Sequence, residues 1–187
     1  MYFAAIVAFV VGITAMVVLT QTGPTRIGVD GLLDNWGPQD MAKRAQYVLI
    51  GTVNDKIVSS IDSDPARHDK PMVYTDIVID VEQDVAEKYK DSQITVRTLG
   101  GKTDKYWVDV SYSPTFEIGE KVLMFVSKEP ESEMGDNYFV LAQELGKYKI
   151  VDGKAYGKDH EKGIDLDQFI SGIHSALPED ARNSNPN

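Results

Sequence analysis

The sequence predicts a mainly β protein: an antiparallel β-barrel with a short N-terminal helix and a C-terminal helix, preceded by one transmembrane helix. Three observations lead to this prediction. Residues 2–20 carry no charged side chain. From Tyr47 onward, apolar residues recur at every second position in short runs separated by turn residues, which is typical of half-buried strands. Near the C-terminus, one run has a helical period instead. Many short strands without intervening helices favour a closed or partly closed barrel.

The composition excludes several functional classes. The 187 residues include 29 acidic and 19 basic side chains, which gives a formal net charge of −10. This charge repels phosphate backbones and anionic lipid surfaces, so we expect no nucleic-acid partner. The chain contains no cysteine, which excludes disulfides, thiolate zinc sites and a cysteine nucleophile.

Residues 1–20 predict a membrane anchor. A helix over residues 2–20 would reach just under the roughly 30 Å of hydrocarbon in a bilayer. A cleaved signal segment is the alternative, but it requires a basic start and a small-x-small cleavage site, and this stretch has neither. A buried core helix would usually show a polar stripe. We therefore expect a single-pass protein of the cell membrane that contacts the lipid bilayer through residues 2–20, with its globular domain extracytoplasmic.

Residues 21–37 predict a tether, because glycines and Pro24 interrupt any periodic pattern. Trp36 would either sit at the membrane interface or dock on the barrel, and we favour docking. A short helix is expected over residues 38–46, where Pro38 suits the first turn. It opens the barrel domain, which we place at residues 38–177.

Six to eight segments of this domain predict strands. The first, residues 47–53, is apolar on both faces, as a central strand would be, and its pattern can continue to Ile61. Residues 73–85 alternate most clearly, with apolar residues on one face and acidic residues on the other. The remaining strands are expected at 94–99, 107–112, 122–126, 138–142, 148–151 and 154–156. The last two flank Asp152 and Gly153, a dipeptide typical of a tight hairpin turn.

The C-terminal helix is predicted to start after Asp165, which can cap it, with Gln168 three residues later to complete a capping box. One apolar stripe follows the helical period. Its members are Leu166, Phe169, Ile170, Ile173 and Leu177. Pro178 ends the helix, and residues 178–187 are expected to form a disordered polar tail.

Three segments, residues 45–53, 116–125 and 145–153, together resemble a group of exported prokaryotic domains of uncharacterised function. They are more distantly similar to the OB-like barrel of netrin and tissue-inhibitor-of-metalloproteinase modules. In those modules a strand like residues 45–53 opens the barrel, and a Gly-Glu-x-Val-Leu-x-Phe strand, here residues 119–125, comes later. The resemblance covers residues 38–177 and implies an OB-like fold. It implies no functional residue, because such inhibitors chelate zinc with an N-terminal cysteine that this chain lacks.

Gly100, Gly101, Lys102 and Thr103 imitate the end of a phosphate-binding loop. The full motif needs a further glycine at the position that Val96 occupies, and a helix after the loop. Because both are missing, the segment is expected to be a turn at the end of a strand.

Three acidic groups carry carboxylate oxygens, which bind hard cations such as Ca²⁺. They are the row Asp76, Asp80, Glu82 and Asp84; the loop residues Asp62, Asp64, His68 and Asp69; and the segment with Asp159, His160, Glu161, Asp165 and Asp167. Neighbours in the row lie about 7 Å apart on one strand face, which indicates a solvated face. The loops lack EF-hand spacing. His174 is expected to have a surface or packing role, and we assign no metal ligand.

Nothing in the sequence indicates catalysis, because none of the three histidines lies in a recognisable nucleophile motif. We assign no catalytic or cofactor-binding residue, no cofactor and no enzymatic activity. Tyr106, Trp107 and Tyr112 are explained by core packing or a cross-strand pair, with an interaction surface as the alternative.

We therefore expect an interaction module, an accessory subunit of a cell-envelope complex that binds a protein partner. The alternative is a Ca²⁺-dependent or small-ligand-binding surface domain. A protease inhibitor is a third class, supported by fold analogy alone.

Overall fold

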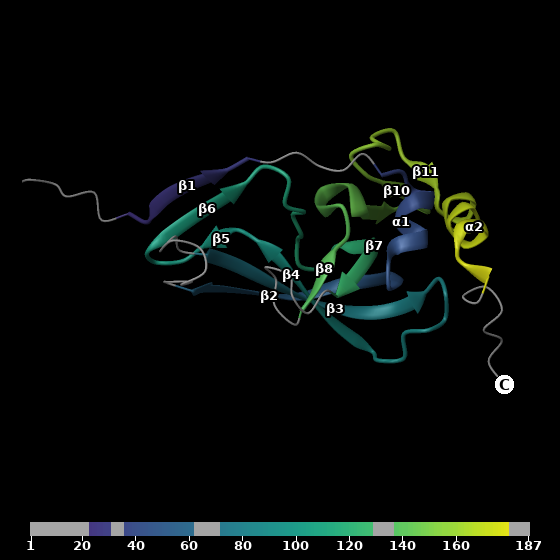
Figure 1. Ribbon diagram of the computed structural model, residues 1–187, viewed down its shortest axis with the longest axis horizontal. Helices are drawn as coiled ribbons and strands as arrows, with labels where there is room; N and C mark the ends of the chain where they lie inside the picture. Colours follow the sequence, from purple (N-terminus) through teal and green to yellow (C-terminus); the bar gives the residue numbers. More distant parts are fainter. Residues whose placement is uncertain (1–22, 31–35, 62–71, 129–136, 180–187) are drawn as a thin grey trace, which may run out of the picture.

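The computed structural model describes residues 23–30, 36–61, 72–128 and 137–179 (Figure 1). The elements in chain order are β1 (Thr25–Val29), α1 (Pro38–Arg44), β2 (Tyr47–Ile61), β3 (Met72–Asp84), β4 (Gln93–Leu99), β5 (Gly101–Lys102), β6 (Tyr106–Val110), β7 (Lys121–Lys128), β8 (Tyr138–Val140), a 3₁₀ turn (Gln143–Gly146), β9 (Lys147–Val151), β10 (Lys154–Tyr156), β11 (Ile164–Asp165) and α2 (Leu166–Ala176).

Five strands close into a barrel. Their order is β7-β2-β3-β4-β8, and β8 pairs again with β7. The prediction of a mainly β protein with a barrel is confirmed. Neighbouring strands are antiparallel except β4 and β8, which pair in parallel where Val96 meets Tyr138. A closed ring with an odd number of strands cannot alternate direction throughout, so the prediction of a wholly antiparallel barrel is wrong at this seam.

The first half of β2, residues 47–53, and most of β7 are buried on both faces, as their apolar sequences predicted. One face of each strand lines the barrel interior, where Leu49 and Met124 are fully buried. The other face packs under the helices, where Val48 and Phe125 are buried. The barrel core and the helix-covered core are therefore two layers that share these two strands.

Helices α1 and α2 cover one end of the molecule, together with the extension β9-β10-β11 (Figure 1). The predicted cap of α2 is confirmed, because the Asp165 carboxylate accepts a hydrogen bond from the Gln168 amide. Phe169 and Ile173 on the predicted stripe are buried. Trp36 packs against the same core and lies 4.6 Å from the Arg44 guanidinium, so its predicted docking is confirmed.

A small sheet covers the opposite end, with strand order β1-β6-β5 (Figure 1). Strand β1 lies inside the segment that was expected to be a tether without packed structure. It pairs in parallel with β6, from Thr25 opposite Tyr106 to Val29 opposite Val110. The five residues of β1 are too few to show a periodic pattern, and their partners in β6 lie 81 positions later in the chain. The sequence pattern therefore could not reveal this strand.

Among the described residues, no helix is long and apolar enough to cross a membrane. The predicted anchor at residues 2–20 lies outside the described residues, as do residues 180–187 of the predicted tail. The anchor therefore stays a prediction.

Candidate functional site

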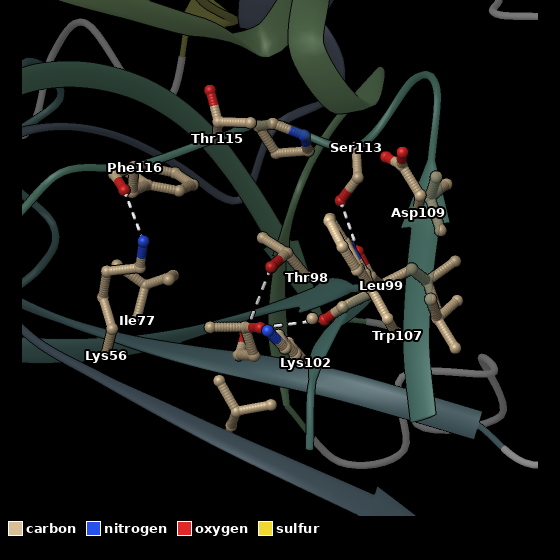
Figure 2. Close-up of a pocket in the computed structure, with 17 residues that line it drawn as sticks. Lys56, Ile77, Thr98, Leu99, Lys102, Trp107, Asp109, Ser113, Thr115 and Phe116 are labelled. Atoms are coloured by element: carbon tan, nitrogen blue, oxygen red, sulfur yellow. Dashed lines mark hydrogen bonds between the residues drawn. The ribbon is translucent and has the colours of Figure 1, made fainter. Parts of the chain in front are cut away.

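A cavity opens at the end of the barrel that the small sheet covers; we call it the barrel-mouth cavity (Figure 2). Its volume is about 390 Å³, and barrel mouths are common sites for ligands. Figure 2 shows Lys56 and Phe116 on one side of the cavity and Trp107 with Asp109 on the other. The lining residues are Lys56, Val58, Thr75, Ile77, Thr98, Leu99, Gly100, Gly101, Lys102, Trp107, Val108, Asp109, Val110, Ser113, Pro114, Thr115 and Phe116.

An irregularity in β2 aims Lys56 and Val58 into this cavity. Val53 pairs with Ile79, but the next pair joins Asp55 to Val78, so Asn54 is an extra residue in the strand. Such a bulge exchanges the two faces of a strand beyond it. Without the extra residue, Ile57 would face inward. With it, Lys56 lies opposite Ile77 and Val58 lies opposite Thr75 on the cavity side.

The hydroxyl groups in the cavity wall are engaged with backbone carbonyls. Thr75 Oγ1 donates to the Gly100 carbonyl at 2.8 Å, and Thr98 Oγ1 donates to the Thr75 carbonyl at 3.2 Å. Ser113 Oγ donates to the Leu99 carbonyl at 2.7 Å (Figure 2). The Ser113 bond joins the loop to β4, and the two threonine bonds join β3 to β4 and to the turn at Gly100. The wall is therefore held in place before anything binds.

The Gly100–Gly101 pair is a turn between β4 and β5, as predicted, and not a phosphate-binding loop. Both glycines have positive φ, 94° and 139°. A Cβ on Gly101 would lie 2.7 Å from Thr75 Oγ1, so only glycine lets the turn approach β3 this closely. The turn carries the chain from the barrel into the small sheet and forms part of the cavity wall.

The rim of the cavity combines an aromatic ring with positive charge. The Trp107 side chain is 40% exposed, and Arg26 Cζ and Lys102 Nζ lie 4.7 and 5.3 Å from its ring centroid. Such distances are within the range of cation–π interactions. Arg26 also pairs with Asp109 at 3.0 Å. With Lys56 on the opposite side, the rim is cationic in a chain whose net charge is −10.

The structure separates the three aromatics that the sequence grouped. Tyr106 and Tyr112 pack against the small cluster around Val73 and Val108, as the packing explanation predicted. Trp107 is on the other face of β6 and is exposed, so core packing does not explain it. It contacts Arg26 and Lys102, its partners on the two neighbouring strands, as the cross-strand explanation predicted.

The loop that carries Phe116 is fixed by a buried ion pair. Lys147 Nζ lies 2.8 Å from Glu120 Oε1 and donates to the Thr115 carbonyl at 2.6 Å. Burial lowers the pKa of the Lys147 ammonium, and the hydrogen bond with Glu120 opposes this shift. Breaking a buried pair leaves an uncompensated charge, so the pair holds this side of the cavity firmly to β9.

The acidic row on β3 is structural and not a cation site. Asp76 accepts two hydrogen bonds from the Arg97 guanidinium at 2.7 and 2.8 Å. Asp80 accepts hydrogen bonds from Asn54 and Gln93. Glu82 accepts hydrogen bonds from Lys121 and Thr52, and the bond from Lys121 is the larger cause that lowers its pKa.

Asp84, the last member of the row, is only 7% exposed. It accepts backbone hydrogen bonds in the loop after β3, so the prediction of a solvated face is wrong for this residue. In the described part of the chain, no group of acidic and histidine side chains could hold a metal ion.

The structure describes one of the other two acidic groups. Asp62, Asp64, His68 and Asp69 lie outside the described residues. Asp159 accepts hydrogen bonds from the Tyr148 hydroxyl at 3.0 and 3.1 Å. His160 Nδ1 lies 2.9 Å from Asp159 Oδ1, in a geometry that makes no hydrogen bond. Asp165 caps α2, and Glu161, Asp167 and His174 are exposed.

The chain was also compared with known proteins. No protein-family model, no curated protein and no solved structure matches it. The resemblance to exported prokaryotic domains and to netrin-like barrels therefore stays a prediction.

Sequence reasoning did not find this cavity. Its lining comes from β2 to β6 and from the following loop, and no segment of the sequence carries it alone. One local signal was present: Asn54, Asp55 and Lys56 interrupt an otherwise apolar strand. A polar break in a central strand indicates a bulge or the start of an unpaired edge.

Proposed function

We propose that this protein is a membrane-anchored, extracytoplasmic interaction module without catalysis of its own, an accessory subunit of a cell-envelope complex. Its protein partner would bind at the barrel-mouth cavity. The uncharged, apolar sequence of residues 2–20 supports the placement in the membrane. The acidic balance of the chain supports a protein partner over a nucleic acid.

We further propose that the barrel is OB-like. Strands β2, β3 and β4 follow one another, and β7 returns beside β2, which is the order of a Greek key. An OB-fold is a five-stranded Greek-key barrel, and β8 supplies the fifth strand. Barrels of this kind use their outer strands and loops as binding platforms for chain-like ligands.

The observation that carries the proposal is the exposed Trp107 at the cavity rim. Tryptophan and arginine are enriched in the residues that dominate binding energy at protein interfaces, and Arg26 lies against the Trp107 ring. The hydrogen bonds and the ion pair that hold the walls reduce the ordering cost that binding must overcome.

Small-ligand binding is the second candidate, and the cavity favours it independently. Its volume of about 390 Å³ falls within the range of small-molecule sites, about 300–1,000 Å³. A ligand of this class would be amphipathic and anionic, to match the apolar floor and the lysines. The Ca²⁺-dependent form of this function would depend on residues 59–71, because the described residues 159–167 hold no group of side chains that could bind a metal ion.

Photo-cross-linking in intact cells tests the interaction module. A photoreactive phenylalanine analogue replaces Trp107 in the full-length chain, and the matched control carries it at Val151, which has the same exposed fraction, 40%. We expect one discrete protein adduct from position 107 and none from position 151. Equal labelling at both positions, or no adduct at either, would argue against a partner at the cavity.

A further inference from the structure

The outer half of β2 has one unpaired edge in the described part of the chain. Strand β3 pairs with β2 as far as Ile61, whereas β7 pairs with it only up to Thr52. Gly119 and Glu120 still bond the backbone of Val53. Beyond the bulge at Asn54, no described strand pairs with this side of β2. An unpaired edge of this length is a template for another strand.

The backbone amides along this edge can be assigned. The Lys56 amide donates to the Asp55 carboxylate at 2.7 Å instead of to β3. In an antiparallel pair, hydrogen-bonded positions alternate along each strand. The amides of Lys56 and Val58 therefore both point to the open edge, and the amide of Ile57 points to β3.

The side chains along the edge are exposed and partly apolar. Ile57 and Val58 are 53% and 40% exposed. Val58 and Lys56 face the barrel-mouth cavity, and Ile57 faces the opposite side because side chains alternate. A strand placed at this edge would thus direct every second side chain toward the cavity.

We propose that the partner binds by adding an extended strand to the open edge of β2, with an acidic side chain beside Lys56 and an apolar side chain beside Val58. This inference rests on the proposed interaction function and specifies its partner. Side chains on adjacent strands lie about 5 Å apart when directly opposite. The recognised pattern is therefore an acidic and an apolar residue separated by one position.

Charge complementarity selects an acidic strand. Lys56 and Lys102 line the cavity, and Arg26 lies against the Trp107 ring at its rim. Lys56 Nζ donates to the Phe116 carbonyl at 2.6 Å, and Arg26 is paired with Asp109. Because the chain as a whole carries a charge of −10, an acidic segment is repelled elsewhere and attracted at this rim. Backbone hydrogen bonds supply affinity in strand addition, and alternate side chains supply specificity.

A fluorescence titration tests the proposal directly. The full-length protein carries Trp36→Phe, which leaves Trp107 as the only tryptophan of the two in the chain. The probe is an acetylated seven-residue peptide in which Thr and Val alternate and Glu replaces the central Val. The two remaining Val residues are each separated from the Glu by one position. The matched peptide has Lys at the central position. We expect a saturable change in Trp107 emission with the Glu peptide and at least tenfold weaker binding of the Lys peptide.

Two pairs of variants separate the backbone contribution from the charge. Val58→Pro removes one edge amide that no described residue uses, and Val58→Ala keeps it. Lys56→Glu should reverse the peptide preference, whereas Lys154→Glu, exposed on β10, should leave it unchanged. We expect Val58→Pro to weaken the Glu peptide at least tenfold relative to Val58→Ala. Circular dichroism and thermal melts confirm that each variant is folded.

The outcomes distinguish this inference from the proposed function. If neither peptide binds at millimolar concentration, if both bind equally, or if Val58→Pro binds like Val58→Ala, strand addition is wrong. A cross-link from position 107 that persists in the Val58→Pro variant would retain the interaction module and exclude this mode of binding. If no adduct forms at position 107 in the otherwise wild-type chain, the proposed interaction function itself is wrong.

Discussion

Asp84 is a buried carboxylate that organises the loop after β3. It accepts backbone hydrogen bonds from Ala86 at 3.1 Å, Lys88 at 2.7 Å and Tyr89 at 2.8 Å. Several amide donors converging on one carboxylate satisfy its charge without a basic partner. One side chain therefore replaces the ladder hydrogen bonds that the chain loses where β3 ends.

We predict that Asp84→Ala lowers the free energy of unfolding by about 2–4 kcal/mol, because buried donors lose a charged acceptor. Asp91→Ala, at an exposed position shortly before β4, is the control and should change it by less than about 0.5 kcal/mol. Urea unfolding at pH 7 measures both. Equal effects of the two variants would contradict the role assigned to Asp84.

Tyr148 is a second residue whose environment determines its chemistry. It is fully buried, and its hydroxyl donates to Asp159. Burial raises the pKa of the Tyr148 phenol, and the charge of Asp159 adds to the shift. The folded chain therefore holds this proton more tightly than the unfolded chain. The resulting stability is complete below the unfolded pKa of about 10 and is lost as the pH rises toward the folded value.

We predict that Tyr148→Phe is less stable than the wild type at pH 7 by about 1–3 kcal/mol, because a hydrogen bond to a charged group is lost. Above pH 10 the wild type should lose up to about 1.4 kcal/mol per pH unit through this group, and the variant should not. Part of the alkaline loss should remain, since burial also raises the pKa of Tyr89 to about 12. Urea midpoints at pH 7, 10 and 11 test this; parallel pH profiles of the two proteins would contradict it.

At the scale of elements, α2 is held to the barrel by its apolar stripe. Ile173 is fully buried, and the tilted rings of Tyr148 and Phe169 lie in the same core with their centroids 4.7 Å apart. Isolated helices of this length are marginal in water. The stability of α2 therefore comes from docking, and the cap at Asp165 specifies where the helix starts.

We predict that Ile173→Ala lowers the free energy of unfolding by about 2–4 kcal/mol, because it opens a cavity in the core under α2. The neighbouring His174→Ala, on the exposed face, should be nearly neutral. Urea unfolding monitored by far-UV circular dichroism compares the two. Similar losses from both variants would show that α2 is not stabilised by this stripe.

At the scale of the whole molecule, the two ends of the barrel differ in role. The helices cover the outer face of β2 and β7 at one end of the molecule, and the small sheet lies at the opposite end (Figure 1). The cavity opens at the end with the small sheet. Strand β1 begins at the cavity end, and residues 21–25 can span at most about 17 Å when extended. If residues 2–20 cross the bilayer, the cavity therefore lies close to the membrane surface.

We predict that the full-length protein stays with the membrane fraction after alkaline carbonate extraction, and that deletion of residues 2–20 releases it. The melting temperature should change by less than a few degrees, because the deletion removes none of the residues that form the two described cores. Deletion of residues 180–187 is the control and should leave the protein with the membranes. Release of the full-length chain by carbonate would contradict the anchor, and protease treatment of whole cells tests the extracytoplasmic placement.

Much of the fold could be predicted because its signals are local. Alternation identified β3, two-sided burial identified β2 and β7, and the Asp152–Gly153 dipeptide identified a hairpin whose turn residues have φ values of 48° and 72°. The cap at Asp165 and the stripe beneath α2 were also correct. Each of these features depends on residues within a few positions of one another. At that range, backbone geometry and side-chain periodicity can be recognised directly in the sequence.

The remaining features depend on contacts between distant segments, which local patterns do not encode. The parallel seam between β4 and β8 follows from closing an odd number of strands, and β1 is a strand because β6 pairs with it. One extra residue at Asn54 decides that Lys56 and Val58, and not Ile57, face the cavity. The cavity, its cationic rim and the open edge of β2 exist only where these segments meet, because burial and pairing are properties of the folded arrangement.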